Sequence, residues 1–137
     1  MKKLVSIFTV SFLLLIAFSS ISIACNKGCT PGYWKQAQHW DSWINHSTGD
    51  AFDDVFTCED TGELTLLEAL KKGGGGIYAL RRHAVASLLN CEAFPCFDGG
   101  SPLDAVEDYC SSLDSAMSIE TQKDEFETNN DQTCPLN

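Results

Sequence analysis

Seven cysteines follow an apolar segment at the start of this 137-residue chain, and these two features together limit how it folds. Two lysines precede an apolar run over residues 4–18, and Ser22-Ile23-Ala24 places small residues at positions −3 and −1 of a cleavage site. This is the pattern of a secretory signal peptide. We therefore expect residues 1–24 to be removed, which leaves a single domain over residues 25–137. No second apolar stretch follows, so we expect no integral membrane span after cleavage.

Export determines the interpretation of the cysteines, because disulfides form in oxidising compartments and are rare in the cytosol. An odd number leaves at least one cysteine outside an intramolecular bridge. Cys25, at the cleavage point, carries a lipid anchor in one alternative and is a free thiol or an intermolecular bridge in the others. From the signal peptide we expect bacterial-type export, which would place the protein in the periplasm, at the cell surface or in the medium. The disulfide candidates are the other six cysteines: Cys29, Cys58, Cys91, Cys96, Cys110 and Cys134.

The mature chain is strongly acidic. Without residues 1–24, which hold two of the 9 Lys and Arg residues, 7 basic residues stand against 19 acidic ones. We exclude nucleic acid as a partner, because phosphate contacts need a clustered basic surface. After Asn90 there are 11 acidic residues and one basic residue, Lys123. This region is either a solvated face that keeps the protein soluble or a patch for a basic partner or divalent cations.

The sequence predicts an all-α fold, a small helical domain stapled by disulfides. No alternation of apolar and polar residues extends beyond four positions, which argues against strands. Thr30-Pro31 and Ser101-Pro102 each combine a helix N-cap with a first-turn proline, and Thr65 is a further N-cap. The helical segments we expect are 31–38, a single turn at 52–56, 65–72, 77–90, a helix from 102, and 118–127.

Four consecutive glycines, Gly73 to Gly76, interrupt the helical pattern. Glycine runs cannot propagate a helix without a large entropic cost, so they mark a tight corner. Lys71, Lys72, Arg81 and Arg82 flank this corner, and backbone N–H groups at a helix start can hold an anion. The phosphate-loop spacing is absent, however, and no strand precedes the glycines. We therefore expect a structural corner.

Several blocks of the sequence resemble a module of exported bacterial proteins that begins Thr-Pro-Gly-Tyr-Trp-Lys-(Asn/Gln). Residues 29–36 read Cys-Thr-Pro-Gly-Tyr-Trp-Lys-Gln. Two further blocks are similar, a helix leading into glycines at 65–76 and Arg-His-Ala-Val-Ala-Ser-Leu-Leu-Asn at 82–90. Weaker similarity lies at 123–126 and 134–136. The resemblance implies export and a fold more than an activity.

The resemblance also implies a pairing of cysteines. The cysteines shared by the family correspond to Cys29 and Cys134, so we expect a bridge between them. For the remaining cysteines, a bridge from Cys58 to Cys91 or Cys96 is one option. The acidic region between Cys91 and Cys110 has no counterpart in the family and is expected to be particular to this chain.

Four aromatic residues lie within eleven positions. Large aromatic side chains supply much of the buried area of a small core, and exposed ones stack on sugars or contact proteins. Core residues are the simpler interpretation, with a binding platform as the alternative. Trp43 is expected to be the exposed member because it lies off the stripe of the other two tryptophans. The candidate binding residues are Tyr33, Trp34, Trp40 and Trp43.

The leading hypothesis is a non-enzymatic secreted or cell-surface binding or structural module that contacts an extracellular glycan or surface protein through these aromatics. The alternative is a hydrolase-like enzyme that uses His83 or His39 with a carboxylate such as Asp41. No His-x-x-x-His spacing or nucleophile elbow is present, so we expect no catalytic residue, no metal site and no cofactor.

Overall fold

The computed structural model describes residues 26–136, and these are all-α, as predicted. The described residues contain no strand, only two isolated bridges, between Lys27 and Thr133 and between Ala51 and Thr65. The predicted signal peptide and Cys25 lie outside the described residues. The elements are α1 (Pro31–Trp34), η1 (Ala37–Ser42), α2 (Phe52–Val55), α3 (Leu66–Lys71), α4 (Ile77–Ala93), α5 (Pro102–Ser111), η2 (Ser112–Asp114) and α6 (Ala116–Asn130).

The predicted helix starts are confirmed by their side-chain caps. The Thr30 hydroxyl accepts a hydrogen bond from the Tyr33 N–H at the start of α1. Thr65 and Ser101 form capping boxes at the starts of α3 and α5, which satisfy otherwise unpaired backbone donors on both sides of the cap. Local sequence therefore determines where these helices begin.

Three predicted helices have different lengths in the structure, and one of them is α4, which was expected to end at Asn90 but continues to Ala93. The segment 31–38 was expected to be one helix, but α1 ends at Trp34 and a 3₁₀ helix, η1, follows an extended Gln36. This break places Trp34 in the interior and Trp40 at the surface, so tertiary packing overrides the three-residue apolar spacing. At the other end, α6 begins two residues earlier than predicted, because Ser115 accepts a hydrogen bond from the Ser118 N–H and caps the helix.

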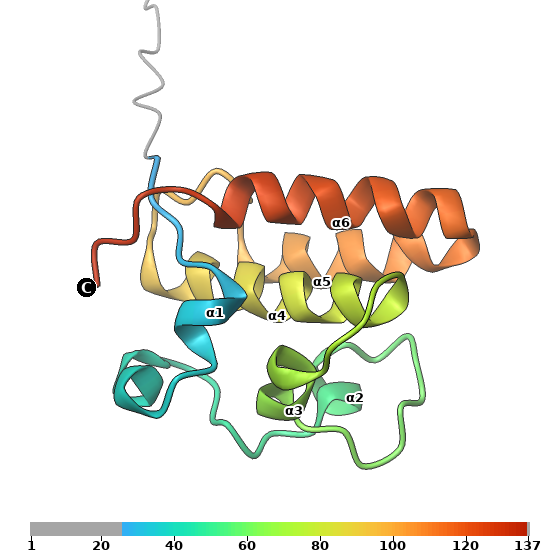
Figure 1. Cartoon of the computed structure of the whole chain (residues 1–137), viewed down its shortest axis with the longest axis horizontal. Helices are drawn as coiled ribbons and strands as arrows, with labels where there is room; N and C mark the ends of the chain where they lie inside the picture. The colour runs from blue at the N-terminus through green and yellow to red at the C-terminus, as the bar shows by residue number, and fades with distance from the viewer. Residues whose placement is uncertain (1–25, 137) are drawn as a thin grey trace, which may run out of the picture.

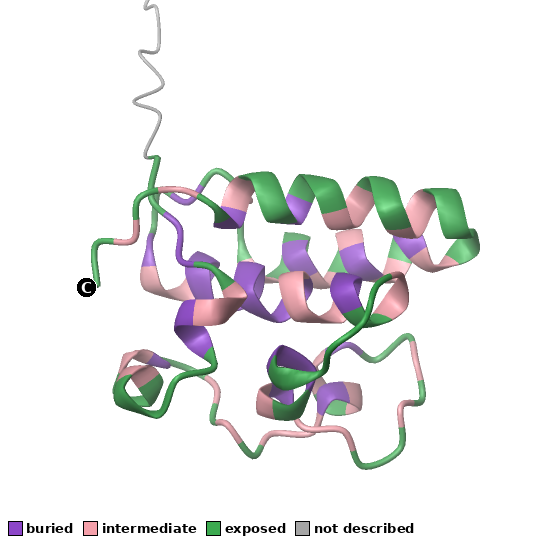
Figure 2. Ribbon diagram, in the orientation of Figure 1, coloured by how far each residue is buried: buried purple, intermediate pink, exposed green. Residues whose placement is uncertain are grey.

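Helix α4 is the central element, with α6 along one side, α5 behind it and α3 below (Figure 1). Every residue from Ala84 to Cys91 is buried, whereas α6 exposes most of its outer face (Figure 2). A helix that is apolar on all sides must be enclosed by others. The acidic C-terminal region therefore supplies covering helices whose charged faces meet solvent.

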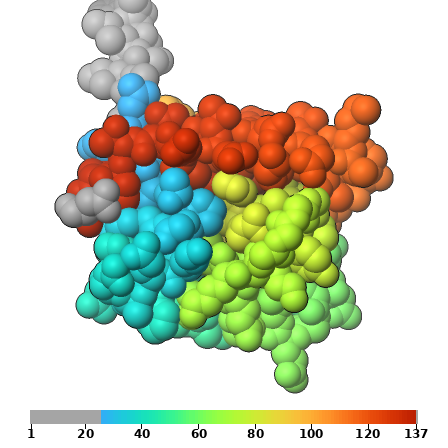
Figure 3. Space-filling view, viewed as in Figure 1, coloured from blue at the N-terminus to red at the C-terminus, as the bar shows by residue number. Residues whose placement is uncertain are grey.

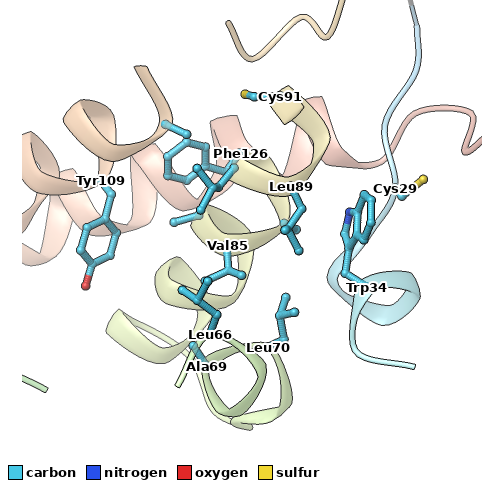
Figure 4. Packing of buried hydrophobic residues seen from close by; sticks show 14 of the residues in the cluster. Cys29, Trp34, Leu66, Ala69, Leu70, Val85, Leu89, Cys91, Tyr109 and Phe126 are labelled. Carbon is cyan, nitrogen blue, oxygen red and sulfur yellow. The ribbon is translucent and has the colours of Figure 1, made fainter. Parts of the chain in front are cut away.

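The core is formed by side chains from every layer around α4 (Figure 4). Phe52, Phe56 and Tyr109 contact one another edge-on or stacked, with ring centroids 4.5 to 5.5 Å apart. The largest fully buried apolar side chains are Trp34, Tyr109, Phe52, Phe56, Phe126, Leu66, Leu70, Leu80, Leu88, Leu89 and Val85.

One buried amide, the side chain of Asn90, joins three parts of the chain. Its Oδ1 accepts hydrogen bonds from the Cys29 N–H at 2.8 Å and the Trp34 Nε1–H at 3.1 Å. Its Nδ2 donates to the Cys29 carbonyl at 2.9 Å and to Asn130 Oδ1 at 2.8 Å. The Asn130 amide in turn donates to the His83 carbonyl at 2.9 Å. Every hydrogen-bonding group of Asn90 that faces the core is thereby satisfied.

Disulfides reinforce this arrangement. Cys29 is bonded to Cys134, the pairing that the resemblance implied, across a sequence separation of 105. Cys58 is bonded to Cys110, so the suggested bridge from Cys58 to Cys91 or Cys96 is wrong. The reason is tertiary: α5 packs against α4 and places Cys110 with its Cα 5.6 Å from that of Cys58. Cys96 is also disulfide-bonded.

Cys91 was a disulfide candidate, and this prediction is wrong: its thiol is free and buried. It lies near the C-terminal end of α4 (Figure 4). Its sulfur is 4.0 Å from the Gly99 carbonyl oxygen. Burial, and then the nearby Asp104 and Glu92 carboxylates, raise the pKa of the Cys91 thiol to about 12. The thiol form is therefore the stable one at neutral pH.

We predict that Asn90→Leu destabilises the protein by about 3 kcal/mol or more, because it leaves the buried Cys29 and Trp34 N–H groups without acceptors. Guanidinium unfolding followed by circular dichroism measures the change. Asn45→Ala, which removes an exposed amide, is the matched control and should have little effect. Equal unfolding midpoints in guanidinium for Asn90→Leu and the wild type would contradict a stabilising role for the hydrogen bonds of Asn90.

We also predict that Cys91 resists iodoacetamide at pH 8 in the native protein and reacts readily after denaturation, since alkylation requires an accessible thiolate. Mass spectrometry of the protein before and after addition of guanidinium measures the modification. Rapid native alkylation at this position would show that the thiol is accessible.

Candidate ligand-binding groove

The structure separates the four aromatic residues that the sequence analysis grouped. Trp34 is fully enclosed, and the ring of Tyr33 lies beneath the imidazole of His39, with centroids 3.7 Å apart. Trp43 was expected to be the exposed member but is buried, whereas Trp40 is 36% exposed. The binding platform of four rings is therefore not present. In a small domain the larger rings are recruited into the core, where they bury the most area.

A groove lies between the segment that precedes α3 and the corner that joins α3 to α4. It consists of two adjoining hollows, of about 480 Å³ and about 230 Å³, that share Thr61, Leu64 and Lys72. Glu63, Glu68 and Lys71 line the first hollow, and Ala69, Tyr78 and Arg81 line the second. On the surface, the N-terminal segments lie against the yellow-green atoms of α3 and the glycine corner (Figure 3).

Each of two exposed aromatic rings beside this groove has a lysine ammonium close to it. Tyr78 is 42% exposed, and Lys72 Nζ lies 5.4 Å from its ring centroid. Trp40 is paired in the same way with Lys71, at 5.6 Å. These distances fall in the range of cation–π contacts. The groove thus has aromatic faces beside it, each with an ammonium group, and the carboxylates of Glu63 and Glu68 in its lining.

One wall of the groove is held in place by a polar cluster and a disulfide. The Glu59 carboxylate accepts hydrogen bonds from the Tyr109 hydroxyl and from the Arg81 guanidinium. Burial, and then the hydrogen bond to Glu59, raise the pKa of Tyr109, so the hydroxyl remains a donor. The neighbouring Cys58–Cys110 bridge ties the same segment to α5.

The glycine corner is structural, as the sequence analysis expected. Gly74 and Gly76 adopt positive φ values of 103° and 55°, a region that favours glycine. The Arg82 guanidinium donates to the carbonyls of Lys72 at 2.6 Å and Gly74 at 2.9 Å. Arg82 therefore braces the corner, which leaves Lys71 and Lys72 as the basic side chains free to meet a ligand.

Within residues 26–136, neither histidine proposed for the hydrolase alternative forms an ion pair with a carboxylate. His39 stacks on Tyr33, and the buried Nδ1 of His83 has no hydrogen-bond partner within residues 26–136. Burial lowers the pKa of His83, which favours a neutral packed side chain. Instead His46 Nδ1 lies 2.6 Å from the buried Glu92 carboxylate. Glu92 also accepts from the Asn45 N–H, so this pair fastens the loop before α2 to α4.

The acidic C-terminal half covers α4 with exposed carboxylates. In the described part of the chain, no group of three or more His, Cys, Asp or Glu side chains is arranged to hold a metal ion. Across residues 26–136, no helix is both long and apolar enough to cross a bilayer.

Sequence reasoning missed Tyr78 and Thr61 as groove residues. A usable signal for Tyr78 was its position: it follows the glycine corner and lies off the apolar face of Ile77 and Leu80. An aromatic residue on the solvent side of a helix start indicates a ring that the core does not use. Thr61 gave no such signal, because only the folded chain brings its loop beside α3.

The whole chain was compared with family models, with curated proteins and with solved structures, and none of these matches it.

We predict that replacing Cys58 and Cys110 by serine loosens the groove wall. The loss of this bridge costs up to ~4 kcal/mol in the chain-entropy model, and amides 59–64 should exchange hydrogen faster. Unfolding by guanidinium and hydrogen exchange measure the two effects. The matched control is Thr57→Ala with Ser111→Ala, which alters the exposed neighbours of the same cysteines. Unchanged exchange in the double serine variant would show that other contacts hold the wall.

Proposed function

We propose that this chain is an exported, non-enzymatic binding module and that its groove beside the α3–α4 corner binds an extracellular glycan. The observation that carries the proposal is the exposed ring of Tyr78 on the edge of the groove, with Lys72 beside it. Ligand sites combine apolar surface with a few polar groups that orient the ligand. A pyranose ring has the same character, with an apolar face and a rim of hydroxyls.

The shape and support of the groove favour a preformed site. Thr61 is fixed because its N–H donates to the Asp53 carboxylate at 3.0 Å. Arg81 is fixed by Glu59, and Arg82 braces the backbone of the corner. Groups that are already ordered lose little conformational entropy when a ligand binds. The rigid wall therefore supports binding by an otherwise small contact area.

Export is part of the same proposal. The predicted signal peptide, together with disulfides in a small domain, is typical of proteins that work outside the cytoplasm. Polysaccharides are abundant partners there. A surface protein that occupies the same groove is the competing ligand.

We predict that the oxidised mature protein binds glycans on an array and that Tyr78→Ala weakens this binding about tenfold, the loss of about 1.4 kcal/mol. Trp40→Ala should have a smaller effect, because Trp40 lies beside the groove rather than lining it. Met117→Ala, which removes the 81% exposed side chain on α6, is the control.

Two outcomes would overturn this proposal. One is that no glycan binds the folded wild type. The other is that Tyr78→Ala, with an unchanged melting temperature, binds as the wild type does.

A further inference from the structure

The charge of the groove differs from that of the rest of the molecule. The mature chain has 7 basic residues and 19 acidic ones, yet four of the seven basic residues lie at the α3–α4 corner. The groove itself is lined by three basic side chains, Lys71, Lys72 and Arg81, and by the two carboxylates of Glu63 and Glu68. Basic side chains are thus concentrated at this corner, with two carboxylates among them, whereas acidic side chains predominate in the rest of the mature chain.

The charged side chains that line the groove differ in whether they are already bonded within the protein or free to bind a ligand. The Glu68 carboxylate accepts from the Thr65 N–H at 2.9 Å and from its hydroxyl at 3.0 Å, so it is occupied as a helix cap. Arg81 is neutralised by Glu59. The two exposed lysines have no salt bridge within the described residues. The basic groups of the groove that are free of ion pairs are therefore the two ammonium groups of Lys71 and Lys72, and the carboxylates of Glu63 and Glu68 balance part of the charge of the lining.

These two ammonium groups lie close to the exposed rings. Lys71 is placed at Trp40 and Lys72 at Tyr78, on consecutive residues of the chain. A neutral sugar that stacks on either ring has to share it with a hydrated ammonium and offers no charge in return. An acidic sugar packs against the ring and supplies a carboxylate to the ammonium, a charge-assisted hydrogen bond about twice as strong as a neutral one.

We infer that the ligand of the groove is an acidic glycan, a polymer of hexuronic acid residues whose carboxylates meet Lys71 and Lys72 while its rings contact Tyr78 and Trp40. This inference rests on the proposed glycan-binding function. The acidic remainder of the surface repels such a polymer and confines its binding to this corner. Two hollows that share Lys72 suit successive residues of one chain.

The test compares oligouronates with their methyl esters, which have the same backbone without the charge. Oligomers of galacturonate, of mannuronate and of alternating glucuronate and N-acetylglucosamine are titrated into the oxidised mature protein by calorimetry. We expect at least one acid to bind at least tenfold more tightly than its ester, with an affinity that falls as salt rises.

Substitutions of Lys71 and Lys72 test whether these two ammonium groups cause the preference for the acid over the ester. Lys71→Gln with Lys72→Gln should remove the difference between acid and ester, and Lys71→Arg with Lys72→Arg should retain most of it. Lys35→Gln, which removes an exposed charge at the end of α1, is the matched control and should leave the difference intact. Melting curves verify that each variant is folded.

The outcomes separate the two proposals. Equal binding of acids and esters, with dependence on Tyr78, would overturn the preference for acidic glycans and leave the proposed function standing. A loss in Lys35→Gln as large as in the double glutamine variant would also overturn it, because the charge effect would then be non-specific. If neither acids, esters nor neutral glycans bind, both proposals fail.

Discussion

The hydrogen bonds of Asn90 are the constraint on which the rest of the structure depends. A buried amide that lacks partners is costly, so the central helix can occupy its place only when the N-terminal segment and α6 are both present. The Cys29–Cys134 bridge joins the N-terminal segment covalently to the tail that follows α6. Apolar burial alone does not specify which surfaces meet, whereas a fully satisfied polar network does. The N-terminal segment, α4 and α6 can therefore satisfy Asn90 in only one relative arrangement.

The groove depends indirectly on the hydrogen bonds of Asn90, through α4. Helix α4 carries Tyr78 and Arg81 on its first turns and Asn90 near its end, so the network that seats the helix also positions its exposed start. The facing wall is fixed by Glu59, which binds both Tyr109 and Arg81 of α4, and by the Cys58–Cys110 bridge. Two anchors, joined by the Glu59–Arg81 ion pair, thus define the groove. A binding surface with such support requires little rearrangement to receive a ligand.

Much of the helical pattern was predictable because its causes are local. Caps at Thr30, Thr65 and Ser101 and the glycine corner act over three or four residues, and all are present as expected. The errors concern contacts between distant residues. Trp43 was predicted to be exposed because it lies off the stripe that Trp34 and Trp40 would form on one helix. The extended Gln36 breaks that helix, so the stripe does not exist. The pairing of Cys58 depends on where α5 packs against α4, which the sequence does not reveal.

By itself, the sequence determined that this is an acidic all-α domain with cysteines suited to an oxidising compartment and with helices that begin at named caps. Composition, periodicity and short-range hydrogen bonding carry that information. Only the tertiary structure decided which rings are enclosed, which cysteine remains a thiol and that Thr61, Lys72 and Tyr78 face one groove. Those outcomes depend on how separate segments share a small core, because burial of one side chain excludes another from the same space.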